Sequence, residues 1–184
     1  MMSNPSPGPS GHPLPAGEGS GWRWVCILIG SDSDAAVMNE ACRALDEAGI
    51  RYEMKVASAH RSPERTKQIV TDAERDGAAV FIAAAGMAAH LPGVIAAYTT
   101  RPVIGVPLPG SPLQGLDALL AVVQMPPGVP VATVAIGGAR NAAILASQIL
   151  ALEDSALATR LKEQRSAMAA SVAEKSKQVE RSTR

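Results

Sequence analysis

Three side chains of the sequence are suited to moving a proton beside a bound anion: His60, Arg61 and His90. Histidine is the side chain that changes its charge nearest to neutral pH, and arginine is a permanent cation that binds phosphate and carboxylate groups. His60 and Arg61 belong to the motif SAHR, which follows the apolar run 52–57 and precedes a helix-forming segment, 64–76. The two residues therefore lie on a turn between a predicted strand and a predicted helix.

The second candidate motif, AAAGMAAHLPG at residues 83–93, contains His90. A run of small residues after a strand usually indicates that a helix packs closely on the sheet. Because this run ends in a histidine and Leu-Pro-Gly, its small side chains can instead line a dry, close-fitting pocket. The residues alone leave both interpretations open.

The third candidate motif is GSDSD at residues 30–34, which joins the first apolar run to the first helical segment. Serine and aspartate here are typical of helix capping, in which their oxygens accept hydrogen bonds from unpaired backbone N–H groups. In the functional alternative, Gly30 lets the backbone approach a ligand, Ser31 and the helix N-terminus hold an anion, and Asp34 accepts ribose hydroxyls. The absence of GxGxxG argues against a dinucleotide site. Asp32 and Asp34 also resemble a phosphotransferase pair, but the Lys and acidic residues that support magnesium at later strand ends are missing.

Apolar runs alternate with helical periodicity along the chain, which predicts a parallel sheet covered by helices on both faces. The predicted strands are residues 25–29, 52–57, 80–84, 102–106 and 131–136. The predicted helices are residues 37–48, 64–76, 91–99, 116–123, 141–152 and one more that begins near Ser155. In such sheets, ligands bind at the carboxyl ends of the strands, and all three motifs lie at such ends.

The composition favours one domain with an aliphatic core and excludes several classes of binding protein. The chain has 184 residues, of which 47% are apolar and 3% aromatic. Its 17 basic residues equal its 17 acidic ones, whereas general binders of nucleic acid or acidic membranes carry a basic surplus. Cys26 and Cys42, without CxxC or Cys/His clusters, indicate a reduced cytoplasmic protein without a metal site. No apolar stretch approaches the ~20 residues that cross a bilayer.

We expect three segments in the chain. Residues 1–21 are a disordered extension rich in Pro, Gly and Ser, residues 22–173 a single domain that includes a C-terminal helix, and residues 174–184 a frayed charged tail. Leu157, Leu161, Met168 and Val172 form one narrow apolar seam on the C-terminal helix. So thin a stripe predicts packing against a neighbouring subunit, and hence a homo-oligomer.

The motifs GSDSD, SAHR, AAHLPG, PVIGVP, VQMPPGVPVATVAIG and NAAILASQILA, in that order, closely resemble those of the class I PurE family. This is the family of the N5-carboxyaminoimidazole ribonucleotide mutases of purine biosynthesis. The resemblance covers about residues 24–165, nearly all of the foldable chain. Six motifs in the same order are too many for a chance similarity.

The resemblance implies a flavodoxin-like three-layer sandwich that assembles as an octamer, with active sites at subunit contacts. It implies an isomerase that converts N5-carboxyaminoimidazole ribonucleotide into 4-carboxy-5-aminoimidazole ribonucleotide without metal, ATP or organic cofactor. By matching position, His60 is the general acid/base, Ser31, Asp34 and Arg61 bind the ribonucleotide, and Ser58 and His90 lie in the same pocket. The full set of candidate substrate-binding residues is Gly30, Ser31, Asp34, Ser58, Ala59, Arg61, Gly86, Met87, Ala88, His90 and Leu91.

The chemistry of this reaction fits the residues. A carboxylate can move from nitrogen to C4 by loss and recapture of carbon dioxide, for which a closed apolar pocket such as residues 83–89 is useful. After recapture, a base must remove the hydrogen from C4. His60 adjoins the arginine that would anchor the phosphate, so we assign it the proton transfer and give His90 a pocket-shaping or hydrogen-bonding role.

Two positions depart from a common version of the family motif, GAGGAAH, which has glycines where this chain has Ala84 and Met87. A methionine there narrows the pocket and leaves His60 untouched. The animal-type carboxylase, which adds free carbon dioxide to aminoimidazole ribonucleotide, differs in the stretch matching AAHLPG. Direct carboxylation and a non-catalytic flavodoxin-like FMN carrier are the alternative hypotheses. The lack of aromatic residues on the strand-end motifs counts against the flavin carrier.

Overall fold

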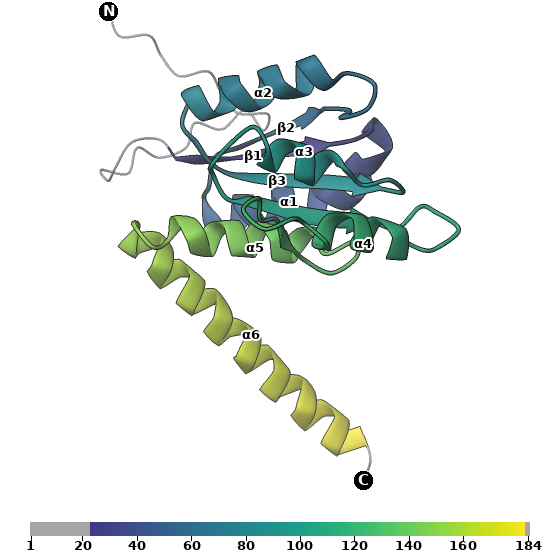
Figure 1. The fold of residues 1–184 in the computed structure, drawn as a ribbon. Helices are drawn as coiled ribbons and strands as arrows, with labels where there is room; N and C mark the ends of the chain where they lie inside the picture. The colour runs from purple at the N-terminus through teal and green to yellow at the C-terminus, as the bar shows by residue number, and fades with distance from the viewer. Residues whose placement is uncertain (1–22, 183–184) are drawn as a thin grey trace, which may run out of the picture.

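The alternating apolar runs form a five-stranded parallel sheet with helices on both faces, in a computed structural model that describes residues 23–182 (Figure 1). The strands are β1 (Trp24–Ile29), β2 (Tyr52–Val56), β3 (Ala78–Gly86), β4 (Val103–Leu108) and β5 (Ala132–Thr133). The helices are α1 (Ala35–Ala48), α2 (Pro63–Arg75), α3 (Leu91–Ala96), α4 (Leu116–Val123), α5 (Ala139–Leu150) and α6 (Ser155–Ser182). This architecture confirms the expected flavodoxin-like three-layer sandwich.

The strands lie in the order β2-β1-β3-β4-β5, and β1 is the point from which strands are added on both sides. The chain steps from β1 to β2 at one edge and then crosses back to form β3 on the other side of β1. The helices that follow β1 and β3 lie on opposite faces, because α1 packs in one hydrophobic cluster and α3 in the other. The carboxyl ends of β1 and β3 therefore flank the topological switch point, where ligands bind in sheets of this kind.

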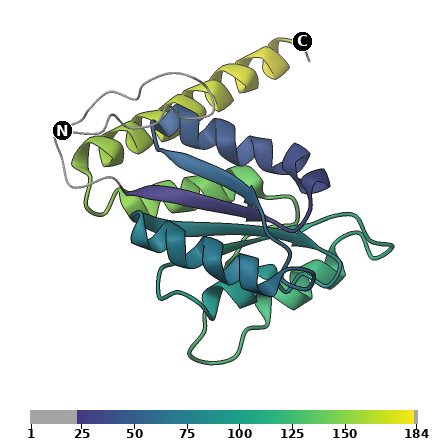
Figure 2. The same ribbon diagram turned by 90° about the horizontal axis from the view of Figure 1, so that it is seen from above.

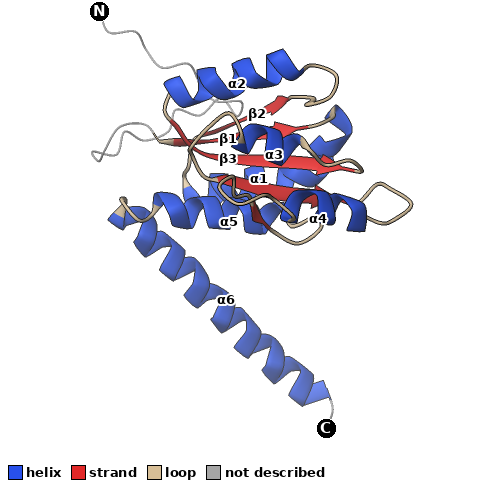
Figure 3. Cartoon of the chain, viewed as in Figure 1, coloured by secondary structure: helices blue, strands red, loops and turns tan. Residues whose placement is uncertain are grey.

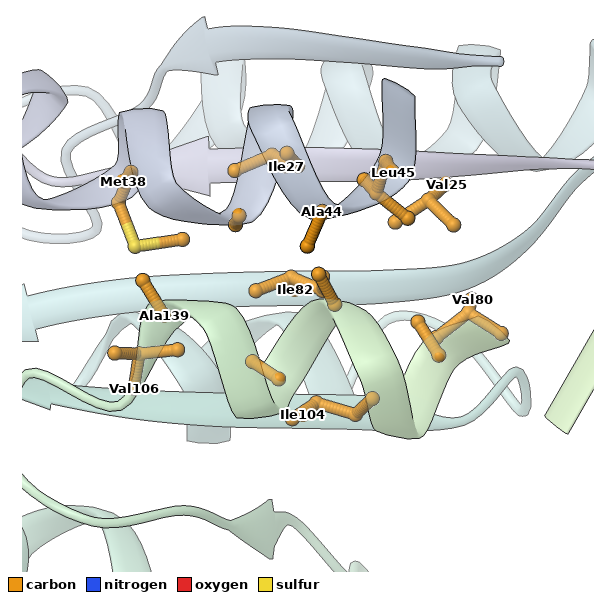
Figure 4. Packing of buried hydrophobic residues seen from close by; sticks show 14 of the residues in the cluster. Val25, Ile27, Met38, Ala44, Leu45, Val80, Ile82, Ile104, Val106 and Ala139 are labelled. Carbon is orange, nitrogen blue, oxygen red and sulfur yellow. The ribbon is translucent and has the colours of Figure 1, made fainter. Parts of the chain in front are cut away.

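Successive side chains of each strand alternate between the two faces of the sheet. On one face, Val25 and Ile27 of β1 pack with Met38 and Leu45 of α1 and with Ala139 of α5 (Figure 4). On the other face, the cluster combines residues of β1, β3, β4, α2, α3 and α4; large side chains in it are Trp24, Phe81, Leu28, Leu91 and Ile95. Because both faces are buried, the central strands are apolar at nearly every position.

Most predicted elements are present with shifted ends. The Gly49 stop signal is confirmed, since Gly49 ends α1 in the left-handed conformation with φ 68°. The predicted strand 131–136 is largely wrong, because only Ala132 and Thr133 pair with β4. The carbonyls of Gly105 and Pro107 face this edge and accept hydrogen bonds from Val134 and Gly137. Proline has no N–H to extend a ladder on that side, so pairing ends.

The C-terminal helix α6 packs on the body only through its first turns (Figure 3). Leu157 is buried, Leu161 is half-buried, and the Gln164 side-chain amide donates to the Glu47 carbonyl of α1 at 3.4 Å. Beyond that point α6 runs away from the sheet, as the view from above also shows (Figure 2). α6 extends to Ser182, into the segment 174–184 for which the sequence predicts a frayed tail.

Three further predictions concern the N-terminal extension, the two cysteines and membrane-spanning helices. The extension 1–21 lies outside the described residues. Cys26 and Cys42 are both free, and burial raises the pKa of the Cys26 thiol to about 12. Among residues 23–182, no helix combines the length and apolar character that a membrane span requires.

α4 packs closely on the sheet at Gly105 of β4. A Cβ at this position would overlap Cγ1 of Val122 and lie 2.9 Å from Cγ1 of Val131. We expect Gly105→Ala to lower the free energy of unfolding by about 1–3 kcal/mol, because the added carbon forces α4 away from β4. Chemical denaturation measures this loss. Gly86→Ala in β3 is the control, since its Cβ would meet nothing nearer than 3.5 Å; equal losses in both variants would contradict this packing.

Candidate functional site

Three loops meet at the carboxyl edge of the sheet, and each carries one of the motifs. They follow β1, β2 and β3, and β1 lies between the other two strands. Backbone hydrogen bonds tie the three strand ends together: the Gly30 N–H donates to the Ala84 carbonyl at 3.2 Å, and the Ala57 N–H donates to the Ile29 carbonyl at 2.8 Å. The strand order thus brings together residues that are far apart in the sequence.

The imidazole rings of His60 and His90 are in direct contact at this edge. Nε2 of His60 lies 2.8 Å from Nδ1 of His90, and the rings meet edge to face with centroids 4.9 Å apart. A hydrogen bond between two ring nitrogens requires one donor and one acceptor, so a single proton lies between them. Both side chains are exposed, so the pair can reach a ligand from solvent.

The loop that carries His60 is held by Ser58 and by the start of α2. Oγ of Ser58 accepts hydrogen bonds from the backbone N–H of Arg61 at 3.2 Å and from its Nε–H at 3.4 Å. Ser62 returns two hydrogen bonds to the Ser58 carbonyl, and Pro63 begins α2. Within residues 23–182, Arg61 forms no ion pair with a carboxylate, so its exposed guanidinium can bind an anion.

The GSDSD loop closes on itself through hydrogen bonds. The carboxylate of Asp34 accepts from the Ser31 N–H at 3.0 Å, and Asp32 accepts from the Ser31 hydroxyl and the Ser33 N–H, both at 3.0 Å. These bonds lower the pKa of Asp32, and the positive charge of Arg61 adds to the effect. Partial burial raises the pKa of Asp34. The bond from Ser31 to Asp34 belongs to a capping box at the short helical turn Asp32–Asp34, whereas the side chain of Asp34, the N-cap of α1, makes no capping hydrogen bond to that helix. The positive charge of Arg61 also acts on this loop.

The loop after β3 corrects one expectation. Ala83, Ala84 and Ala85 lie inside β3 and are buried in the two hydrophobic clusters, so they pack the sheet and do not line an open pocket. The strand continues to Gly86, beyond the predicted end at residue 84, so Ala85 also lies between the layers. Met87 and Ala88 are exposed, and a tight turn from Met87 leads to His90.

The remaining candidates divide between the edge and the core. Ala59 is half-buried beside the second cluster. Leu91 begins α3 and is buried, so only its backbone remains for a ligand. Asp32 and Ser33 were missing from the candidate set, although both belong to the hydrogen-bond network next to Arg61. The alternation of hydroxyl and carboxylate side chains in GSDSD is the sequence feature that indicates a role for Asp32 and Ser33 in this network.

Two hollows of the described chain lie away from this edge. A hollow of about 570 Å³ is lined by Trp24, by charged residues of β2 and by the C-terminal end of α2. A second, of about 290 Å³, lies between α5 and α6. Among residues 23–182, no group of three or more His, Cys, Asp or Glu side chains is placed to hold a metal ion. The histidine pair, Arg61, and the hydroxyls and carboxylates of residues 31–34 are the polar groups at this edge.

Comparisons with known proteins agree on one family. The sequence profile of the AIR carboxylase family matches residues 24–171. The N5-carboxyaminoimidazole ribonucleotide mutase of Pyrococcus abyssi is 55% identical over 144 residues, which are 78% of this chain and 83% of the relative. The mutase of the same name from Bacillus subtilis is 51% identical over 157 residues, 84% of this chain and 97% of the relative. The crystal structure of Treponema denticola PurE superposes with a TM-score of 0.79 at 28% identity, covering 85% of this chain and 98% of that chain.

Proposed function

The chain belongs to the AIR carboxylase (PurE) family, and on that premise we propose that it is an N5-carboxyaminoimidazole ribonucleotide mutase of purine biosynthesis. Its product would be 4-carboxy-5-aminoimidazole ribonucleotide. The observation that carries the proposal is the contact between His60 and His90 beside the unpaired Arg61, at the switch point of the sheet. The substrate is a nucleotide whose carboxylate moves from N5 to C4 while its ribose phosphate does not react. This rearrangement requires a proton carrier next to a site that binds the phosphate.

The proposed reaction conserves atoms and protons. The bond between N5 and its carboxylate breaks, carbon dioxide leaves, and N5 keeps the electron pair and takes a proton from His60. C4 of the ring then attacks the carbon dioxide and forms a C–C bond. His60 removes the hydrogen from C4, which restores the aromatic ring and returns His60 to its starting state. Since the net change is an isomerisation, neither an oxidant nor ATP is consumed.

The groups around His60 support binding and orientation of the ribonucleotide. Arg61 offers a guanidinium for the phosphate, and the Ser31 hydroxyl and Asp34 carboxylate lie on the neighbouring loop for the phosphate and ribose. His90 fixes the orientation of the His60 ring through the 2.8 Å hydrogen bond. Anchoring a phosphate that does not react provides binding energy for orienting the base. The two free cysteines agree with a cytoplasmic enzyme.

The proposal extends to a homo-oligomer, for which the resemblance implies an octamer. Met168 and Val172 of α6 are 54% and 67% exposed, and this part of the helix extends away from its own sheet (Figure 1). On α4, Leu116, Leu120 and Val123 are also exposed. Apolar side chains in rows on two helices are typical of surfaces that pack against another subunit. Neighbouring copies would then enclose the open edge that carries the histidine pair.

Replacing the proposed acid/base tests the function directly. We expect His60→Asn to lose at least about 100-fold in turnover of N5-carboxyaminoimidazole ribonucleotide, since positioned acid/base catalysis contributes ~10²–10⁴-fold. The folded structure should persist because the side chain is exposed. Product is measured by its ultraviolet absorbance, and substrate analogue binding by calorimetry. Near-normal turnover of the variant would remove His60 from the mechanism. If the wild-type protein converted only aminoimidazole ribonucleotide with bicarbonate, and not N5-carboxyaminoimidazole ribonucleotide, direct carboxylation would be favoured.

Removing the proposed phosphate anchor should affect binding before it affects the proton transfer. We expect Arg61→Ala to weaken ribonucleotide binding by about 2 kcal/mol, the cost of losing a charged hydrogen-bond partner. Calorimetric titration with the product nucleotide measures this loss. The control is Arg75→Ala at the other end of α2, where Arg75 pairs with Asp72 at 2.5 Å. Unchanged affinity in Arg61→Ala would place the phosphate elsewhere.

A charge in the seam of α6 tests the oligomer. We expect the double substitution Met168→Glu and Val172→Glu to reduce the molar mass in solution, because two carboxylates cannot be buried in an apolar contact. Light scattering after size exclusion measures the mass. Ala170→Glu, which lies on the opposite side of α6, should leave the mass unchanged. A wild-type protein that is monomeric at micromolar concentration would contradict the proposal.

A further inference from the structure

Met87 has a backbone conformation that is unfavourable for its side chain. Its φ is 53°, and among residues 23–182 only Gln114 shares a positive φ without being glycine. An L-residue in this left-handed region carries a steric penalty that glycine avoids. Such strain persists where the surrounding structure holds the residue in place, and strained residues cluster at functional sites.

Core packing does not explain the methionine. Its side chain is 61% exposed, while Ala85 and Ala89 on either side of the turn are buried. Met87 and His90 are the only large side chains between Ile82 and Leu91. A glycine at position 87 would therefore remove the strain without opening a cavity in the described chain. The large side chain has to be useful outside the core.

The place of Met87 points to the reaction. It directly follows β3 at the switch point, and the turn that it starts ends at His90, whose ring contacts His60. The neighbouring reactive groups are polar: the two imidazoles, the Arg61 guanidinium and the hydroxyls of the GSDSD loop. Carbon dioxide is small and apolar, so polar groups and water cannot retain it. A thioether is apolar and has flexible torsions, which let it adapt to a ligand.

We propose that Met87 is a specificity-determining residue that covers the reacting carbon dioxide and keeps it at C4 until the new bond forms. This role rests on the proposed mutase function. In this role the exposed side chain at position 87 reaches over the reacting carbon, and the strain of the left-handed backbone is the cost of that placement. The cover determines which carbon dioxide is used: the molecule released from the substrate, and not one from solution.

The test follows the carboxylate by isotope. The substrate carries a 13C-labelled carboxylate, and the solution contains unlabelled bicarbonate with carbonic anhydrase, so that any escaped carbon dioxide exchanges. The wild type should retain the label in its product. Met87→Ala and Met87→Gly should lose several-fold more label than the wild type and release free aminoimidazole ribonucleotide, whereas Met87→Leu should retain the label because its apolar volume is similar.

Thermal unfolding separates the cover from the strain. Met87→Gly and Gln114→Gly should both raise Tm by a few degrees, because each relieves a left-handed side chain. Of these two glycine variants, only Met87→Gly should lose the 13C label, because Gln114 lies outside the site. Full label retention in Met87→Ala and Met87→Gly, with the wild type active, would overturn the role of Met87 alone. Equal loss in Met87→Leu would also overturn it. A wild type that does not convert the substrate would instead overturn the mutase function itself.

Discussion

The hydrogen bond between His60 and His90 depends on the position of β1 in the sheet. The loops that carry the two rings follow β2 and β3, which are not neighbours but lie on either side of β1. Adjacent strands are ~4.8 Å apart, so the two strand ends are separated by roughly 10 Å. Both loops must lean over the end of β1 for the rings to meet at 2.8 Å. The residues that continue β1, Gly30 and Ser31, are small and leave room for this approach.

The same order explains which parts of the fold the sequence could predict. Strands buried on both faces are continuous apolar runs, and β1 could be read directly from residues 25–29. α1 could be read from its spacing and from the Gly49 stop. β5 could not, because its length depends on a donor that Pro107 lacks in a different strand. The apolar pattern of residues 131–136 reports burial, and pairing depends on the partner strand.

The candidate site, like the fold, could be predicted only in part. Alternating strands and helices place His60 and His90 at one edge, but they do not specify which strands are neighbours, so they leave the distance between the rings open. Small side chains such as Ala83–Ala85 suit both close packing and a pocket, so the sequence alone does not show that they are buried in β3. The left-handed backbone at Met87 had no signal either, since methionine gives no indication of positive φ. What the residues did indicate was the chemistry, because imidazole and guanidinium have few other uses at the end of a buried strand.

The open position of the histidine pair limits how a single chain can work. Both rings and Arg61 are exposed, and the two described hollows lie elsewhere on the chain. A reaction that releases and recaptures carbon dioxide requires closure, because escape by diffusion competes with recapture. The sheet provides the reactive groups and their orientation, but the alanines within β3 are buried in its own core. In the mechanism that we propose, closure would come from groups that the core does not need: the exposed side chain of Met87 in the loop and, in the proposed oligomer, the surface of a neighbouring copy around it. Assembly would then be a condition for retaining the intermediate, and the apolar rows on α4 and α6 would affect catalysis without touching the substrate.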